Sequence, residues 1–339
     1  MSTPGTPHGP YLIFVGDIAE PAYAKTAIGL LDWAPERCIG ELALGESAVS
    51  VGLPKLSPSE ARANGGRALL IGVATPGGLI PAHWVSTLIE ALGAGLDIVS
   101  GMHARLSEVP GLSQAARQAG RQLIDIRVPP SNIPVGTGRP RSGRRLLTVG
   151  TDCALGKKYT ALAITRSLRE RGVDADFRAT GQTGIMIAGS GIPIDSVVAD
   201  FVSGAAEMLS PEASRAHIDV IEGQGSLFHP AYAAVSLGLL HGSQPDMFVV
   251  CHLPSRAHVL GYPAFPLPSI EAVIERTIAL GRLTNDSIRC VGLSLNTADL
   301  DDDEALRLLA SEGERLGVSV ADPIRGGATF DRLIDACIE

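Results

Sequence analysis

The segment LLTVGTDCALGKKYT, residues Leu146–Thr160, decides the fold of the second half of this chain. An apolar strand, 146–149, runs into a glycine-bounded loop, and a helix is predicted over 157–169. A phosphate-binding loop needs this order, because glycines turn backbone N–H groups inward on an anion, the helix presents its positive end, and a lysine adds a point charge. Lys157 is that lysine. The segment therefore predicts a P-loop that holds the phosphates of a nucleotide-type ligand.

The loop departs from the usual P-loop pattern in two ways. Gly150 and Gly156 are separated by five residues where four are usual, and Lys158 stands where a Ser or Thr hydroxyl normally binds Mg²⁺. An ordinary glycine-rich turn with two surface lysines is the alternative interpretation. The residues expected to bind the cofactor are Gly150, Thr151, Asp152, Cys153, Ala154, Leu155, Gly156, Lys157 and Lys158.

Predicted strands and helices alternate on both sides of this segment. Strands are expected at 11–15, 68–73, 97–100 and 123–128 before it, and at 176–179, 218–221, 247–251, 290–295 and 318–321 after it. Helices are expected at 22–31, 81–94, 195–208, 269–280 and 303–316. This alternation is typical of an α/β fold with a parallel sheet flanked by helices in each half.

The segment PPSNIPVGTGRPRSGRR, residues 129–145, has no hydrophobic period and indicates an interdomain linker. Its arginines either solubilise the linker or include one that reaches a ligand phosphate. The first ten residues, rich in Pro, Gly and Thr, are expected to be frayed.

Composition narrows the class of function. The net charge of −8 argues against a nucleic-acid surface and favours a small-molecule partner. The five cysteines are odd in number and form no CxxC pair, so they predict neither a disulfide framework nor a metal site and fit a cytoplasmic location. No signal sequence and no apolar run of the ~18 residues that span a membrane is visible. A two-domain enzyme of this size is expected to be a homo-oligomer.

Further candidate residues stand where predicted strands end, because the ligand crevice of an open α/β sheet lies outside the carboxyl ends of its strands. Glu222 is either a general base, a cation ligand or a structural acid, and His229 is either a proton carrier or a packed histidine. Cys153 is interpreted as a packing residue rather than a nucleophile, and Asp195 as a helix N-cap. The candidates for substrate binding are Arg178, Thr180, Gly181, Gln182, Thr183, Gly184, Gly225 and Ser226, and Asn296 is placed to read an adenine base.

The loop resembles that of dethiobiotin synthetase and its P-loop relatives. In those enzymes a loop aspartate, a hydroxyl residue after the lysine and a strand-end glutamate serve Mg-ATP. Asp152, Lys157 and Glu222 match that pattern, but Lys158 does not match the hydroxyl residue. The resemblance implies an ATP- and Mg-dependent ligase or kinase as the alternative function.

Nearly the whole chain resembles a second family, long known only as a domain of unknown function and now associated with D-glutamate N-acetyltransferase. The resemblance rests on Gly16-Asp17, VGTDCALGK at 149–157, TGQTG at 180–184, EGQGS at 222–226 and Asp322-Pro323. It implies an N-terminal Rossmann-like domain over 1–135 and a C-terminal P-loop NTPase-like domain over 136–339. The implied reaction moves an acetyl group from acetyl-CoA to the amine of an acidic D-amino acid such as D-glutamate.

Acetyl transfer to an amine needs a base, donors that polarise the thioester oxygen, and a charged clamp for the substrate carboxylates. Glu222 or His229 is the expected base, and N–H groups near 181–184 are the expected donors. Arg178 or Arg256 is the expected clamp, since a guanidinium binds a carboxylate through two hydrogen bonds. A P-loop that only cradles the phosphates of coenzyme A would tolerate the loss of the Mg²⁺ hydroxyl at Lys158. A nucleotide-binding regulator without catalysis is the remaining hypothesis.

Overall fold

The computed structural model describes residues 9–339 and divides them between two units. The first unit runs to Pro129 and also includes Gln182–Pro193, and the second contains Pro130–Gly181 and Ile194–Glu339. The expected boundary near residue 135 lies close to the division at Pro129, whereas the return of the chain to the first unit was not expected. The expected fraying of the first ten residues falls largely outside the described residues.

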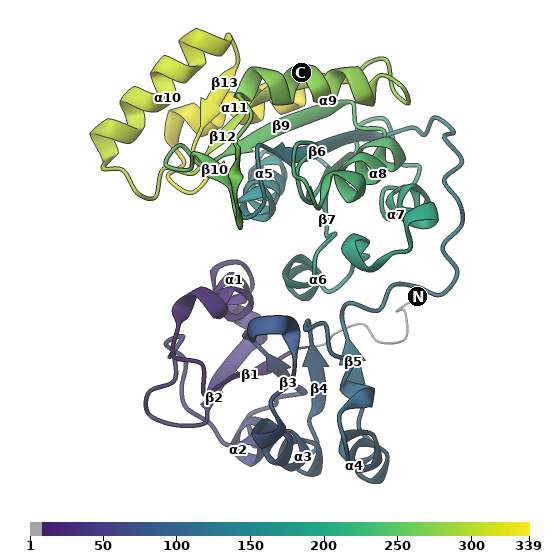
Figure 1. Cartoon of the computed structure of the whole chain (residues 1–339), viewed down its shortest axis with the longest axis vertical. Coiled ribbons are helices and arrows are strands. Elements are labelled where there is room, and N and C mark those ends of the chain that lie inside the picture. Colours follow the sequence, from purple (N-terminus) through teal and green to yellow (C-terminus); the bar gives the residue numbers. More distant parts are fainter. Residues whose placement is uncertain (1–8) are drawn as a thin grey trace. The chain divides into compact units, whose positions relative to one another are not determined.

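The first unit is a parallel five-stranded sheet with strand order β2-β1-β3-β4-β5 (Figure 1). The strands are β1 (Tyr11–Gly16), β2 (Cys38–Ala43), β3 (Ala68–Ile71), β4 (Asp97–Ser100) and β5 (Leu123–Asp125). The helices are α1 (Lys25–Trp33), α2 (Pro58–Ala63), α3 (Val85–Gly93), α4 (Leu112–Ala119) and α6 (Gln182–Ala188). β1 is buried throughout, as expected for a strand covered by helices on both faces.

The second unit is a parallel six-stranded sheet with strand order β13-β12-β9-β6-β8-β7. Its strands are β6 (Arg144–Gly150), β7 (Ala175–Arg178), β8 (Ile218–Ile221), β9 (Met247–His252), β12 (Arg289–Leu295) and β13 (Ser319–Ala321), and β10 (His258–Val259) pairs with β11 (Tyr262–Pro266) in a separate hairpin. Its helices are α5 (Lys157–Glu170), α7 (Val202–Leu209), α8 (Ala233–Ser243), α9 (Ile270–Gly281), α10 (Asp302–Leu316) and α11 (Gly327–Ile338). The predicted α/β class is confirmed.

The strand order of the second sheet positions the loop. β6 lies at the centre, with β8 on one side and β9 on the other. The order of strands therefore reverses at β6, and such a reversal opens a ligand crevice at the carboxyl ends of the strands. The loop between β6 and α5 occupies that position (Figure 1).

Two predicted features of the second half were wrong. The expected helix over 195–208 is two short 3₁₀ turns followed by α7, and Asp195 lies in the first turn instead of capping a helix. The turn expected over Thr180–Gly184 ends at Gly181, because α6 begins at Gln182. Glycine at 184 suggested a turn, but Thr183–Ile187 are buried and packing overrides that preference. α6 lies beside α1 (Figure 1). Between the two helices, Thr183 Oγ1 lies 3.2 Å from Thr26 Oγ1.

The arginines that end the linker stabilise the amino end of β6. Arg145 is buried, and its guanidinium donates to the carbonyl oxygens of Arg141, Ser142 and Gly143. Arg141 donates to the carbonyl oxygen of Gly242 at 2.7 Å. A strand advances about 3.3 Å per residue, so the length of β6 separates these groups from the loop at its carboxyl end. Arg141 and Arg145 are therefore structural, contrary to the idea that one of them reaches a phosphate.

Candidate active site

The loop between β6 and α5 presents backbone N–H groups without acceptors. Gly156 is the N-cap of α5 with φ +106°, and Ala154 also has a positive φ, 52°. Within residues 9–339, no group accepts a hydrogen bond from the N–H of Ala154, Leu155 or Gly156. Successive free N–H groups at the positive end of a helix form an anion-binding concavity. The geometry thus fits the phosphate loop that the sequence predicts.

Lys157 is the first residue of α5 and only 7% exposed. Its Nζ donates to the carbonyl oxygen of Asp152 at 2.7 Å. Burial lowers the pKa of the Lys157 ammonium, and the neighbouring Cys251, Cys153, Asp152 and Glu222 partly offset that effect. An ammonium has three N–H donors, so two remain for an anion in the loop. A phosphate would bring further negative charge to this buried ammonium, since the neighbouring Asp152 carboxylate is already paired with Arg256.

Asp152 is fully buried and its carboxylate is already paired. Oδ2 accepts from Nη1 of Arg256 at 3.0 Å and from the N–H of Leu260 at 2.8 Å, while Oδ1 accepts from the N–H of Cys153 at 2.7 Å. The same Arg256 nitrogen donates to the carbonyl oxygen of Cys153 at 2.7 Å. These contacts hold the β10–β11 segment on the loop. Arg256 thus clamps a carboxylate of the protein itself.

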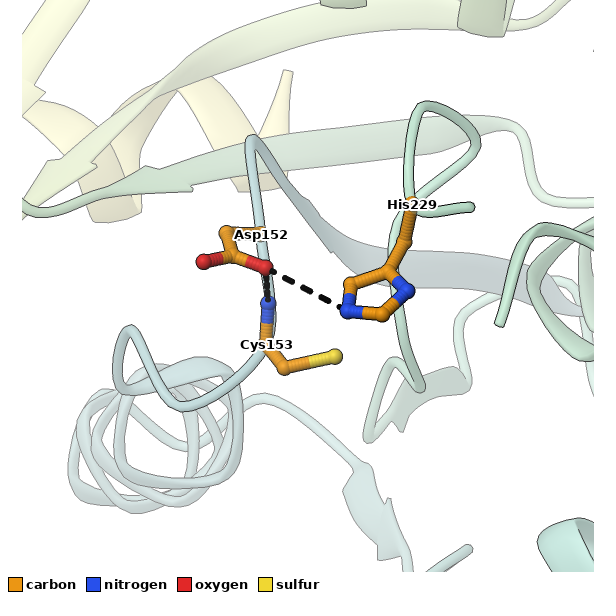
Figure 2. Close-up of side chains that lie close together, drawn as sticks. All are labelled: Asp152, Cys153 and His229. Carbon is orange, nitrogen blue, oxygen red and sulfur yellow. Dashed lines mark hydrogen bonds and ion pairs between the residues drawn. The ribbon is translucent and has the colours of Figure 1, made fainter. Parts of the chain in front are cut away.

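His229 lies in the same corner of the second unit and is 2% exposed. Its Nδ1 accepts from the N–H groups of Ala231 (3.1 Å) and Tyr232 (3.2 Å), and its ring stacks on Tyr232 at 4.5 Å between centroids. Because Nδ1 accepts hydrogen bonds, it carries no proton, and in a neutral imidazole the proton then lies on Nε2. Nε2 faces Asp152 Oδ1 at 3.9 Å, too far for a hydrogen bond (Figure 2). His229 is therefore placed as a donor rather than as a base.

Figure 2 shows Asp152, Cys153 and His229 facing one another. One potential ligand atom from each lies within 4.8 Å of the others, a spacing that a metal ion could use. Arg256 already neutralises the carboxylate, however, and a cation beside a guanidinium is unfavourable. Burial raises the pKa of the Cys153 thiol, with Lys157 opposing that shift. The thiol is thus neutral at ordinary pH, which suits a packing residue.

Glu222 follows β8 and is 6% exposed. Its Oε2 accepts from the N–H groups of Thr180 (2.9 Å) and Gly181 (3.1 Å). Burial raises the pKa of Glu222, while the charge of Lys158, these two hydrogen bonds and Lys157 act in the opposite direction. A carboxylate whose pKa lies above its usual range is better matched to proton transfer near neutral pH. Because Glu222 accepts from the N–H groups of Thr180 and Gly181, these two groups are not available to polarise a ligand oxygen, as the sequence analysis had expected for Gly181.

Gly223 has no room for a side chain. A Cβ there would collide with the carbonyl oxygen of Thr148 and lie 3.2 Å from Cδ of Lys157. The N–H of Gly223 instead donates to Thr148 Oγ1 at 2.9 Å. This close approach aligns the end of β8 with β6 and so places Glu222 beside the loop.

We expect Gly223→Ala to lower the free energy of unfolding by at least about 3 kcal/mol, because backbone of β6 would have to move. Urea denaturation followed by circular dichroism measures this effect. Gly313→Ala is the matched control, since a Cβ there meets its nearest atom at 3.6 Å and alanine favours the interior of α10. Equal stability of the two variants would contradict the proposed close packing.

The structure divides the remaining substrate-binding candidates between the units. Arg178 pairs with Asp219 at 2.5 Å and with Asp176 at 3.4 Å, so its guanidinium binds carboxylates of the protein. Thr180 and Gly181 belong to the second unit, whereas Gln182, Thr183 and Gly184 belong to the first.

Gly225 and Ser226 lie beside the phosphate loop. Ser226 Oγ donates to the carbonyl oxygen of Thr151 at 3.2 Å. Gly225 has a φ of +55°, and a Cβ there would lie 2.7 Å from Ser236 Oγ. Ser226 therefore contacts the loop directly, whereas Gly225 packs against the start of α8.

Asn296 follows β12 and lines a cavity of about 490 Å³ together with Pro254, Asp299 and Arg307. Its Oδ1 accepts from the N–H of Ala298 at 3.2 Å, and no residue in the described part of the chain accepts from its Nδ2. The amide therefore has a free donor next to a space of ligand size.

The loop after Asn296 is held by the buried carboxylate of Asp322. Oδ2 accepts from the N–H of Thr297 at 2.9 Å and from its hydroxyl at 2.6 Å. Oδ1 accepts from the N–H of Ile324 at 2.9 Å. Asp322 thus fixes the end of β12.

His252 also borders the loop, and the sequence analysis did not single it out. It ends β9, and its Nδ1 lies 3.0 Å from the hydroxyl of Thr151. Burial and the charge of Arg256 lower the pKa of His252. Its position at the end of an apolar strand was the available signal, the same signal that pointed to Glu222.

Family models match both units of this chain. Residues 134–333 match the P-loop domain of a domain of unknown function, DUF1611_C, and residues 41–129 match its Rossmann-like partner, DUF1611_N. The chain belongs to the DUF1611 family. A DUF1611 family protein from Anabaena variabilis has a similar crystal structure, with a TM-score of 0.84 and 33% identity over 96% of this chain and 97% of that one. The predicted Rossmann-like and P-loop units are confirmed.

Two relatives with similar sequences are both named D-glutamate N-acetyltransferase. The protein from Tritonibacter scottomollicae is 44% identical over 96% of this chain and 98% of its own length. The protein from Pseudoalteromonas sp is 46% identical over 94% of this chain and 96% of its own length. The resemblance noted from the sequence motifs is therefore confirmed.

Proposed function

We propose that this enzyme transfers an acetyl group from acetyl-CoA to the amine of D-glutamate. The two named relatives, similar over almost their whole length, support the reaction and the amine acceptor. The choice of acetyl-CoA as the acetyl donor rests on one observation. Asp152 is paired with Arg256, beside a loop whose backbone N–H groups have no hydrogen-bond acceptor. This loop can hold phosphates, but its aspartate is not available to Mg²⁺ and Lys158 replaces the usual hydroxyl ligand. Phosphate binding without cleavage suits coenzyme A better than Mg-ATP.

In this proposal the free amine of D-glutamate attacks the thioester carbonyl, the C–S bond breaks, and coenzyme A leaves as a thiolate. The thiolate takes up the proton that the amine has lost and becomes the thiol product. Glu222 accepts the proton that the amine loses, since its carboxylate is buried and its pKa is raised. The Nε2–H of His229 donates to the thioester oxygen as negative charge develops there. Lys157 and the loop N–H groups bind phosphate, and the free amide of Asn296 reads the adenine.

Lys158→Gln should shift the acidic limb of the kcat–pH profile to higher pH. The Lys158 charge lowers the pKa of Glu222, so removing that charge raises the pKa. A base must be deprotonated, so activity is lost as pH falls through this pKa, and the variant loses it at a higher pH. Lys158→Arg, which keeps the charge, is the control. An acidic limb that Lys158→Gln leaves in place would contradict Glu222 as the base.

The experiment that tests the function is thiol release from acetyl-CoA by the purified protein, with D-glutamate and L-glutamate in parallel and without ATP or Mg²⁺. Release that depends on D-glutamate is the expected result. Release of inorganic phosphate from Mg-ATP, without thiol release, would instead support a ligase or kinase related to dethiobiotin synthetase. Binding of either nucleotide without turnover would indicate a regulator.

We also propose that the protein is a cytoplasmic homo-oligomer whose partner is a small molecule, without a nucleic-acid or membrane partner. The net charge and the five free cysteines support this assignment. Within the described residues, no helix combines the length and apolar character needed to cross a bilayer. Light scattering of the purified protein tests the oligomeric state.

A further inference from the structure

The chain leaves the second unit for the first over Gln182–Pro193, a segment that we call the excursion. The second unit stops at Gly181 and resumes at Ile194. The N–H of Ile194 donates to the carbonyl oxygen of Thr180 at 3.0 Å, so the two ends of the excursion meet at Thr180. The N–H of Thr180 in turn donates to Glu222, the proposed base. The excursion therefore leaves and rejoins the second unit beside that carboxylate.

Gly181, the last residue before the excursion, lies against Glu222. Its N–H donates to Oε2 at 3.1 Å. A Cβ at Gly181 would lie 3.4 Å from Oε1 of Glu222 and 3.0 Å from Nε2 of Gln224, so the absence of a side chain allows this close approach. Thr180 is fixed to the second unit by its hydroxyl, which donates to the carbonyl oxygen of Glu222 at 2.7 Å and accepts from Gln224. Gly181 has no side chain to form such bonds.

The helix α6 holds the excursion within the first unit. Met186 is fully buried, and a Cβ at Gly101, which follows β4, would lie 2.8 Å from its Cε. Near the start of α6, Thr183 Oγ1 lies 3.2 Å from Oγ1 of Thr26 on α1. Near its end, Arg37 Nη1 donates to the carbonyl oxygen of Met186 at 3.1 Å, a contact that stabilises the carboxyl end of a helix. Residues of the first unit thus fix α6 at both ends.

Two backbone angles separate the hydrogen bond at Glu222 from α6. The peptide plane is rigid, so only φ and ψ of Gly181 lie between its N–H and Gln182, the first residue of α6. A displacement of α6 must therefore be taken up by these two angles or by the bond from Gly181 to Glu222. The return of the chain strengthens this coupling, because Ile194 is bonded to Thr180 at the other end of the excursion.

We propose that α6 holds the N–H of Gly181 on the carboxylate of Glu222, and that Arg37 and Thr26 are positioning residues for Glu222 through α6. The inference rests on the proposed function only where it treats Glu222 as the base. It gives the Rossmann-like unit a part in the reaction, since contacts made inside that unit determine the hydrogen bonds of a carboxylate in the other.

Hydrogen exchange in the ligand-free full chain tests the coupling. Arg37→Met should lower the protection of the Gly181 amide about tenfold, and Thr26→Val about threefold, the range for one lost hydrogen bond. Arg37→Lys, which keeps a charged donor, should restore part of the protection. Arg62→Met is the matched control, because Arg62 also belongs to the first unit and donates from Nη1 to a backbone carbonyl oxygen, that of Gly66 at 3.0 Å. Amides of β3 report unfolding of the first unit and should stay protected in every variant.

Infrared titration of the Glu222 carboxyl, identified as the signal that Glu222→Gln lacks, is the second measurement. Burial raises the pKa of Glu222, whereas the charge of Lys158, the N–H groups of Thr180 and Gly181, and the charge of Lys157 lower it. Weakening the bond from Gly181 removes one of the effects that lower this pKa. The carboxyl should therefore become protonated at a higher pH in the Arg37→Met variant than in the unaltered chain or in Arg62→Met.

Two results would overturn the proposal. One is unchanged exchange at Gly181 together with an unchanged titration of Glu222 in both Arg37→Met and Thr26→Val. The other is a change of the same size in Arg62→Met, which would mean that any weakening of the first unit acts on Glu222. Neither measurement needs turnover, so the coupling is tested even if the chain transfers no acetyl group, and the two failures remain distinguishable.

Discussion

Glu222→Gln is expected to lower kcat for acetyl transfer by two to four orders of magnitude, the usual contribution of a positioned general base. The amide cannot accept the proton that the amine loses. Its carbonyl oxygen can still accept from the N–H groups of Thr180 and Gly181, so the local structure should persist. Steady-state kinetics with saturating D-glutamate measure the loss.

Two further measurements separate catalysis from structure. The dissociation constant for acetyl-CoA should change little in Glu222→Gln, because the phosphate-binding groups are untouched. Glu314→Gln, an exposed glutamate of α10, is the matched control and should retain full activity. A Glu222→Gln enzyme with normal kcat would remove Glu222 as the base and direct attention to His252, whose pKa is lowered and which also borders the loop.

The phosphate loop could be predicted from the sequence because all of its parts are local. The strand, the glycines and Lys157 lie within one short segment, and the order of these parts already defines the geometry. Glu222 could be predicted for a similar reason, since it ends an apolar strand. The helix α6 could not be predicted in this way. Glycines at 181 and 184 indicate a turn, and only packing within the first unit stabilises the helix.

The sequence could not show which groups the charged side chains would pair with. Arg178 or Arg256 was expected to hold a substrate carboxylate, but they bind Asp219 and Asp152, which are 41 and 104 residues away in the chain. A guanidinium has the same chemistry toward a ligand and toward a protein carboxylate, and only the tertiary fold decides which of the two it meets.

Lys157→Met is expected to weaken binding of acetyl-CoA roughly 10- to 150-fold, the range for one lost hydrogen bond to a charged group. The variant keeps the length of the side chain and removes its charge. Isothermal titration with acetyl-CoA and with dephosphorylated pantetheine tests the cause, because only the phosphate-bearing ligand should lose affinity. Arg166→Met, at an exposed position on the same helix, is the control for the loss of a positive charge and should bind acetyl-CoA as the unaltered chain does.

The same substitution at Lys157 should raise the stability of the ligand-free protein. Burial lowers the pKa of the Lys157 ammonium, which means that the folded state disfavours its charge. Methionine loses the hydrogen bond to the carbonyl oxygen of Asp152 but also removes the cost of burying that charge, which is the larger effect. A melting temperature that rises while affinity falls would show that Lys157 is retained for the ligand. A fall in both would show that the lysine mainly supports the loop, and the free N–H groups would then be the principal phosphate ligands.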